Sequence, residues 1–276
     1  MVNQTATPVP ADPVEWTAES VRLFWGRFDE LPDSEYSHFS FQRGAAVLKF
    51  VKKHVHLSGP ALDLGCASGR FLDYMAARGI CCVGADVTVR SLAVARQRLS
   101  GRPGFLGVVG LSGQHSLPFK TGSFEAVFLL ETVEHLSGDH VGKIMDEIGR
   151  ILRVGGRIIV TTPYDENLAA HTIVCPVCRR SFHQVQHLRS FNRASLKSIL
   201  SDAGFAGILC SSAPLLPDMH VWLTAQRRFR KTPAVCPACG AGFAAPPVGG
   251  KQRIIDLYRE FRHLICVAEK PDSMTG

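Results

Sequence analysis

Short apolar segments alternate with helix-like segments over most of this chain of 276 residues, and the alternation restricts the folds open to it. Seven segments have the apolar composition of buried strands, and they lie at residues 61–64, 81–85, 107–110, 124–130, 156–161, 208–212 and 264–269. Segments with helical periodicity separate most of them. This order predicts an α/β fold, in which a doubly wound and mostly parallel sheet has helices on both faces.

Two regions outside this alternation set the expected domain organisation. Residues 1–44 combine a polar, Pro-rich tail with an amphipathic segment at 15–30, which predicts an N-terminal helical lid. Residues 45–276 form the predicted core. Within it, residues 171–190 and 213–262 do not fit the alternation, and we interpret them as insertions that form a small metal-binding module and a cover over the substrate.

Composition narrows the class of protein further. Apolar residues make up 46% of the chain and charged residues 20%, which is enough for a large core and excludes a disordered chain. No apolar run is long enough to span a membrane, and the N-terminus lacks the apolar segment of a secretory signal. We therefore expect a cytoplasmic protein whose nine cysteines are thiols or metal ligands rather than disulfides.

Charge is distributed unevenly along the chain. Residues 170–276 carry 14 Lys and Arg against 6 Asp and Glu, whereas the rest of the chain is nearly balanced. A basic region of this kind suits nucleic acid, phosphate or the surface of an anionic membrane. Because the charges are scattered rather than consecutive, we favour an ordinary solvated surface as their explanation.

A glycine-bearing loop follows the first predicted strand. Gly65 and Gly69 allow the backbone to approach a ligand closely, and the helix that begins there offers free N–H groups. Asp63 opens this segment, and Asp86 ends the next strand, where an acid can accept hydrogen bonds from both hydroxyls of a ribose. The combination predicts a site for a nucleoside-containing cofactor.

Four segments then resemble, in order, the motifs of class I S-adenosylmethionine-dependent methyltransferases of the type 11 and type 12 groups. They are LDLGCASG (62–69), VGADV (83–87), LPFKTGSFEAVFLLETVEHL (117–136) and LRVGGRIIVTTP (152–163). The resemblance implies a Rossmann-like seven-stranded sheet whose last strand is antiparallel, with S-adenosylmethionine at the carboxyl ends of the first strands. The residues implied to bind the cofactor are Asp63, Gly65, Cys66, Ala67, Gly69, Asp86, Val87, Gln114, His115 and Leu130.

This chain departs from the family pattern at two positions. Ala67 stands where the family has the middle glycine of the loop, and the methyl group narrows the loop. Gly113 stands where the family usually has an aspartate against the adenine amine, and Gln114 or a backbone group is the expected substitute.

Glu131, Glu134 and His135 follow the strand at 124–130, at the edge where the cofactor is expected. This E-x-x-E-H pattern resembles the ubiquinone-pathway O-methyltransferases and the enzymes that 2′-O-methylate the 3′ ends of small RNAs, and for the latter His187 is the best match to a further histidine. These oxygen and imidazole groups could hold Mg²⁺ or a similar ion, which would lower the pKa of a substrate hydroxyl. Direct action as a base and a purely structural role stay open as alternatives.

Two C-x₂-C motifs predict a zinc site. Cys175 and Cys178 form the first pair, and Cys236 and Cys239 form the second. Two such turns complete a tetrahedral, closed and therefore structural Cys₄ site. A local alternative combines the first pair with His183 and His187.

We therefore predict an enzyme that methylates an oxygen of a small-molecule, glycan or lipid-linked acceptor, with Glu131, Glu134, His135 and His187 as the catalytic residues. Aromatic side chains of the lid would cover the site, and they are Phe24, Trp25, Tyr36, Phe39 and Phe41. Residues 214–231 are expected to form an amphipathic helix over the site, with peripheral membrane contact as an alternative. The alternatives are a metal-assisted RNA 2′-O-methyltransferase and a non-catalytic scaffold with the same fold.

Overall fold

The computed structural model describes residues 12–31, 38–112, 116–138, 140–215, 233–244 and 262–274. The predictions for Tyr36, Gln114, His115 and nearly all of the helix at 214–231 therefore lie outside the described residues.

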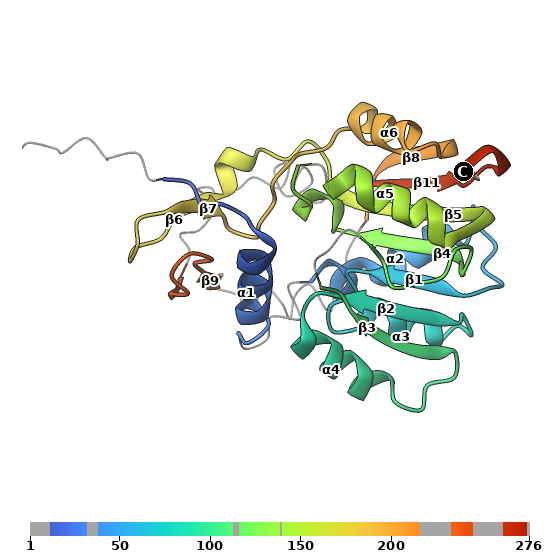
Figure 1. The fold of residues 1–276 in the computed structure, drawn as a ribbon, viewed down its shortest axis with the longest axis horizontal. Helices are drawn as coiled ribbons and strands as arrows, with labels where there is room; N and C mark the ends of the chain where they lie inside the picture. The colour runs from blue at the N-terminus through green and yellow to red at the C-terminus, as the bar shows by residue number, and fades with distance from the viewer. Residues whose placement is uncertain are drawn as a thin grey trace, which may run out of the picture.

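A seven-stranded sheet forms the centre of the molecule, in the order β3-β2-β1-β4-β5-β11-β8 (Figure 1). Its strands are β1 (Ala61–Leu64), β2 (Cys82–Asp86), β3 (Phe105–Gly110), β4 (Phe124–Leu130), β5 (Leu152–Pro163), β8 (Ala206–Pro214) and β11 (Arg262–Glu269). Strands β1 to β5 pair in parallel, whereas β11 is antiparallel to both β5 and β8. The predicted sheet is confirmed, including its antiparallel last strand.

Helices cover both faces of the sheet because both faces are apolar. The helices are α1 (Ala18–Phe28), α2 (Phe39–Val51), α3 (Arg70–Ala76), α4 (Val89–Leu99), α5 (His140–Ile151) and α6 (Arg193–Asp202). Buried residues of α2, α3 and α4 form one core cluster against the sheet, and those of α5 and α6 form another on the opposite face. Every residue of β4 is buried, as expected for a strand covered on both sides. None of the described helices is long and apolar enough to cross a membrane.

Two small hairpins and α1 lie beyond the carboxyl ends of the strands (Figure 1). One hairpin pairs β6 (Thr172–Val174) with β7 (Ser181–His183), and the other pairs β9 (Pro233–Val235) with β10 (Gly242–Ala244). Phe24 and Phe28 of α1 pack with Ile173, Phe182 and Ala234 in a third apolar cluster, separate from the two that cover the sheet. We call the two hairpins together the cysteine module, because each carries one C-x₂-C motif.

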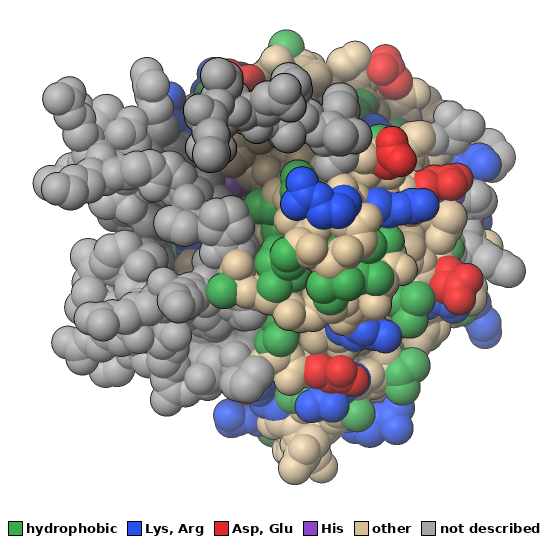
Figure 2. Space-filling model, turned by 90° about the vertical axis from the view of Figure 1, so that its left-hand side faces the viewer, with side chains coloured by type: hydrophobic (Ala, Val, Ile, Leu, Met, Phe, Trp, Pro, Cys, Tyr) green, Lys and Arg blue, Asp and Glu red, His purple; other side chains and the backbone are tan. Residues whose placement is uncertain are grey.

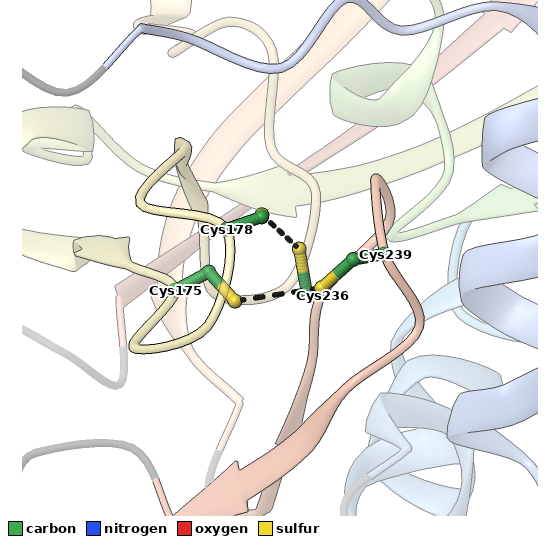
Figure 3. A group of neighbouring side chains, drawn as sticks. All are labelled: Cys175, Cys178, Cys236 and Cys239. Carbon is green, nitrogen blue, oxygen red and sulfur yellow. Dashed lines mark hydrogen bonds between the residues drawn. The ribbon is translucent and has the colours of Figure 1, made fainter.

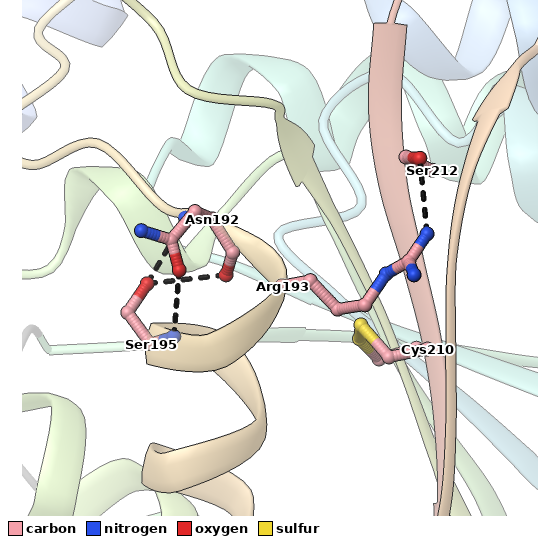
Figure 4. The surroundings of a disulfide bond; sticks show 6 residues. Asn192, Arg193, Ser195, Cys210 and Ser212 are labelled. Atoms are coloured by element: carbon pink, nitrogen blue, oxygen red, sulfur yellow. Dashed lines mark hydrogen bonds between the residues drawn. A yellow bond between two sulfur atoms is a disulfide. The ribbon is translucent and has the colours of Figure 1, made fainter.

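One cysteine pair corrects the sequence prediction. Cys210 of β8 and Cys266 of β11 form a disulfide (Figure 4), whereas we expected free thiols there. The physical reason is the register of the antiparallel pair, which places the two residues directly opposite each other. Nearby, the side chain of Asn192 caps α6 by accepting a hydrogen bond from the Ser195 backbone N–H at 2.9 Å.

Candidate functional site

The loop after β1 requires glycine at two positions, because a side chain there would collide with neighbouring protein atoms. Gly65 has φ +87°, and an added Cβ would lie 2.6 Å from the Thr132 hydroxyl oxygen beyond β4. Gly69 has φ +75°, and its Cβ would lie 2.7 Å from that of Ala95. Ala67 adopts φ +43°, so the loop accommodates alanine at the third position of this turn. Glycine at these two positions therefore lets the loop pack closely against Thr132 and Ala95.

Asp86 fixes the glycine loop from the end of β2. Its carboxylate accepts hydrogen bonds from the backbone N–H of Ala67 at 2.9 Å and of Thr88 at 2.8 Å. Burial raises the pKa of Asp86, and burial followed by the charge of Asp86 raises the pKa of Asp63 to about 8. A ligand that brings positive charge or hydrogen-bond donors would stabilise the charged form of two buried carboxyls of this kind.

The other predicted cofactor residues in the described part of the chain surround the same strand ends. Cys66 and Leu130 are buried, and Val87 is half-buried directly after Asp86. The loop, β2 and β4 therefore bring together the set that the sequence predicted, apart from Gln114 and His115.

Helix α1 reaches this region from the cysteine module. Asp29, which caps its C-terminus, accepts a hydrogen bond from the Ser91 hydroxyl of α4. At the other side of the site, the Trp25 ring stands edge-on to His135 with centroids 5.1 Å apart, and its indole N–H donates to Gln186 Oε1 at 2.6 Å. Of the aromatic residues predicted for the lid, Trp25 thus lies against His135, one of the predicted catalytic residues.

Replacing Asp29 by asparagine is expected to stabilise the folded protein near neutral pH. Burial raises the pKa of Asp29 to about 6, above its ordinary value of 3.8. The folded protein therefore binds this proton more tightly than the unfolded chain does, and stability falls as the pH rises from about 4 to about 6. We expect Asp29→Asn to gain about 1–2 kcal/mol at pH 7 and little at pH 4, by urea unfolding followed through tryptophan fluorescence.

Asp146→Asn, at an exposed position of α5, provides the matched control and should leave stability unchanged at both pH values. An Asp29→Asn protein that is no more stable than the wild type at pH 7 would contradict the burial argument.

Glutamate and histidine side chains gather beyond the carboxyl ends of β4 and β5. Ligand atoms of Glu134, His135 and His187 lie within 4.8 Å of one another, and so do those of Glu166, His183 and His187. His187 Nδ1 lies 2.5 Å from Glu166 Oε2, and His187 Nε2 lies 3.9 Å from Glu134 Oε1. We call these five residues the Glu/His cluster.

Backbone contacts hold the Glu/His cluster together. The short helix η2 (Val133–His135) follows β4, and the segment after β7 wraps around it. Leu188 N–H donates to the Glu134 carbonyl at 2.9 Å, and the Gln186 side chain donates to the His135 carbonyl at 3.1 Å. The positions of His183 and His187 therefore depend on the chain that leaves the first hairpin.

The cluster differs from the predicted catalytic set in three residues. Glu131 is directed to a different partner, since its Oε2 lies 3.1 Å from His263 Nδ1 of β11. Glu166 and His183 join Glu134, His135 and His187 instead. The sequence could have indicated Glu166, because this residue comes shortly after β5 and the carboxyl ends of adjacent parallel strands lie at the same edge of a sheet. Nothing in the sequence indicated the contact of His263 with Glu131, since the position of His263 depends on the antiparallel register of β11 against β5.

Burial dominates the electrostatics of the cluster. It raises the pKa of Glu134 well above its usual range, with a further contribution from Glu131, and it lowers the pKa of His135 to about 3. Burial also raises the pKa of Glu166, but the contacts with His183 and His187 outweigh it and hold that pKa well below its usual range. His135 is consequently neutral at physiological pH.

The four cysteines of the two C-x₂-C motifs come together as predicted (Figure 3). The sulfur atoms of Cys175 and Cys239 are 3.7 Å apart, and those of Cys178 and Cys236 are 3.5 Å apart. A tetrahedral ion with Zn–S bonds of about 2.3 Å requires sulfurs about 3.8 Å apart, so the quartet fits one ion. The local alternative with His183 and His187 is not the arrangement found.

The two cysteine turns have the same hydrogen bonds. Cys175 N–H donates to the Arg180 carbonyl and Cys236 N–H to the Ala241 carbonyl, both at 2.9 Å. N–H groups of the first turn lower the pKa of Cys175 to about 7 against the effect of burial, whereas burial raises that of Cys236 to about 12. The thiols thus share protons that a metal ion would displace.

The surface at this end of the molecule carries both signs of charge. Figure 2 shows Lys and Arg side chains interspersed with Asp and Glu and with hydrophobic groups on its described part. On this face, the described residues form no continuous basic patch of the kind that the composition of residues 170–276 allowed.

The sheet order, the glycine loop and the acid at the end of β2 define a Rossmann-like methyltransferase fold. Residues 62–160 match the family model of the methyltransferase domain. Residues 62–160 accordingly form a methyltransferase domain of the class I S-adenosylmethionine-dependent type, as the resemblance predicted.

Individual relatives match only part of this chain, so they support the methyltransferase domain rather than a particular substrate. The chain is 26% identical over 116 residues to a ubiquinone biosynthesis O-methyltransferase of Nitrosococcus oceani, a match that covers 42% of this chain and 48% of the relative. It is 28% identical over 169 residues to a demethylmenaquinone methyltransferase of Clavibacter sepedonicus, with 59% and 63% covered. The chain thus spans about half to two thirds of the length of these curated relatives.

Solved structures show the same fold at low identity. The [4+2]-cyclase SpnF has a TM-score of 0.62 at 18% identity, over 95% of this chain and 99% of that one. An S-adenosylmethionine-dependent methyltransferase of Methanosarcina mazei has a TM-score of 0.52 at 14% identity, over 80% and 97%. Because a cyclase has this fold too, the fold does not by itself define the reaction.

Proposed function

We propose that this protein transfers a methyl group from S-adenosylmethionine to a hydroxyl of a small-molecule acceptor. The observation that carries the proposal is the contact between the glycine loop and the end of β4. Gly65 lies directly against Thr132, and the Glu/His cluster begins two residues further on at Glu134. Cofactor loop and polar cluster therefore share one edge of the sheet.

The residues of this chain would mainly bind and align the reactants. Bound S-adenosylmethionine supplies an activated methyl group. Gly65 and Gly69 would let the loop bend close to it, and the buried acids Asp63 and Asp86 would face its polar groups. The Trp25 ring, which stands edge-on to His135, would restrict the access of water to it. The Glu/His cluster directs lone pairs toward the acceptor hydroxyl, either directly or through a cation.

The matched relatives favour a small acceptor. Those cited above are named for ubiquinone biosynthesis and for demethylmenaquinone methylation. A quinol or phenol hydroxyl fits a cluster that can accept a proton. Glycan, lipid-linked and RNA acceptors remain predictions from the sequence.

Calorimetric binding of S-adenosylhomocysteine tests the cofactor site, and transfer of labelled methyl to catechols and hydroxyquinones tests the reaction. We expect saturable binding and label in the phenolic products, with no label in matched aromatic amines or an RNA oligonucleotide. Absence of binding by folded protein would favour the scaffold. Binding without any transfer would favour another reaction on this fold.

We further infer that the four cysteines hold one zinc ion in a structural role. Four thiolates leave no open coordination position, and the ion would join two hairpins that are far apart in the sequence. Zinc would thereby also fix α1, since Arg27 Nη1 donates to the Gly240 carbonyl of the second turn at 2.8 Å.

A further inference from the structure

We propose that Gln186 is a positioning residue, which holds His135 in one ring orientation and makes this hold depend on Trp25 of helix α1. Gln186 follows β7 by three residues and is fully buried. It forms hydrogen bonds with both other residues, although it belongs to neither of their elements. The consequence for methyl transfer rests on the proposed function, whereas the hold on His135 does not.

Two hydrogen bonds connect Gln186 to His135 at separate points. The side-chain amide of Gln186 donates from Nε2 to the His135 backbone carbonyl at 3.1 Å. The backbone carbonyl oxygen of Gln186 lies 3.2 Å from His135 Nδ1. One contact fixes the main chain of His135 and the other fixes its ring, so the two together oppose rotation of the side chain.

The contact with the ring also selects the tautomer of His135. A carbonyl oxygen can only accept a hydrogen bond, so Nδ1 carries the proton in the neutral ring. Nε2 therefore keeps its lone pair, which can accept a hydrogen bond from the hydroxyl of an acceptor. The other tautomer would oppose two lone pairs at Nδ1 and would offer a donor at Nε2 instead.

The backbone of Gln186 favours a functional over a purely structural interpretation. Its φ is +61°, in the left-handed region that is costly for a residue with a side chain. Anchoring of η2 does not require this cost. Leu188 N–H already donates to the Glu134 carbonyl at 2.9 Å, and His135 N–H donates to the Thr132 carbonyl at 3.1 Å. The additional contacts of Gln186 act on His135 alone.

Trp25 determines which way the Gln186 amide faces. The indole N–H of Trp25 donates to Gln186 Oε1 at 2.6 Å. Because an indole nitrogen can only donate and a backbone carbonyl can only accept, Oε1 faces Trp25 and Nε2 faces His135. The Trp25 ring also stands edge-on to the His135 ring, with centroids 5.1 Å apart. Loss of the indole N–H would therefore free the amide to turn and would weaken the hold on His135.

Nuclear magnetic resonance of the full chain tests the contacts without an acceptor. The chain has three tryptophans, so the indole signal of Trp25 is assigned by its absence from Trp25→Phe. We expect this indole proton to be protected from exchange with solvent. With isotope-labelled histidine, the ring signal of His135, assigned by its absence from His135→Gln, should show a proton on Nδ1.

Gln186→Met keeps a side chain of similar size but has no amide. The Trp25 indole proton should then exchange faster. His135 should populate both tautomers, because the remaining carbonyl contact no longer has a fixed main chain to act on. Gln184→Ala is the matched control, since Gln184 is buried in the same segment but its side chain has no hydrogen bond to a residue that the structure describes. It should leave both signals unchanged.

Kinetics test the role in the reaction, with the catechol or hydroxyquinone that the wild type methylates best. Gln186→Met should lower kcat by about 10- to 100-fold, the loss expected when a reacting group is misplaced. The KM for the acceptor and the affinity for S-adenosylhomocysteine should change by less than about twofold, because binding surfaces remain. Gln186→Asn should recover part of kcat, since it restores an amide and tolerates a positive φ. Gln184→Ala should have the kcat of the wild type.

A double-mutant cycle tests whether Trp25 acts through Gln186. Trp25→Phe should lower kcat as well, and the double variant with Gln186→Met should be no slower than the slower single variant. Losses that multiply in the double variant would show that Trp25 acts on its own and would overturn the coupling.

A proton on Nε2 of His135 in the wild type, or wild-type kcat in folded Gln186→Met, would overturn the positioning role. Failure of the wild type to methylate any acceptor would contradict the proposed function instead. The tryptophan and histidine signals would still decide whether Gln186 holds His135.

Discussion

Replacing Cys236 by serine is expected to abolish structural zinc binding and to unfold the cysteine module while the sheet stays folded. The two hairpins contact each other through the four thiols and through only a small apolar cluster. We therefore expect metal binding to supply most of the free energy that keeps them folded. Local opening of residues 172–187 should become easier by several kcal/mol. Hydrogen exchange should accordingly accelerate in β6, β7 and α1 but not in β1 or β4.

The same substitution should abolish methyl transfer, because β7 leads directly to His183 and His187. Cys81→Ser is the matched control, since Cys81 is exposed and immediately precedes β2. It should retain zinc and normal exchange. Zinc content equal to wild type in Cys236→Ser would show that the cysteine pairing is wrong.

The sheet was predictable because its strands are buried on both faces. The segment 124–130 is apolar except for Glu125, and such a run bounded by turn signals has few alternatives to a central strand. The cysteine quartet was predictable for a different reason, since two identical C-x₂-C turns need each other to complete a tetrahedral site whatever the distance along the chain.

The arrangement of the polar cluster depended on packing that the sequence does not record. Glu131 and Glu134 looked equivalent, yet Glu131 lies 3.1 Å from His263, which is 132 residues away. The Cys210–Cys266 disulfide depends on the same strand, because β11 inserts between β5 and β8. Register between distant strands determines both contacts, and no local spacing predicts it.

The structure also connects two features that the sequence left separate. Gln186 receives the Trp25 indole N–H and donates to the His135 carbonyl, so lid, first hairpin and η2 meet at one buried side chain. The cysteine module therefore adjoins the Glu/His cluster, to which its strand β7 contributes His183.

Replacing Asp86 by asparagine is expected to weaken the binding of S-adenosylhomocysteine by about 10- to 100-fold, which corresponds to the loss of a charged hydrogen-bond acceptor worth about 1.5–3 kcal/mol. The carboxylate accepts from Ala67 N–H and Thr88 N–H at its two oxygens. Asparagine can accept at only one, so the glycine loop also loses a contact. Calorimetry on the purified variant measures the change in affinity.

Asp73→Asn is the matched control, because Asp73 of α3 lies 3.3 Å from Arg102, in a surface ion pair away from the carboxyl ends of the strands. It should bind S-adenosylhomocysteine as the wild type does. Asp86→Asn should remain folded, since burial disfavours the charged carboxylate that it removes. Unchanged affinity in folded Asp86→Asn would place the cofactor elsewhere on the sheet and would remove the basis for an acceptor site beside Glu134.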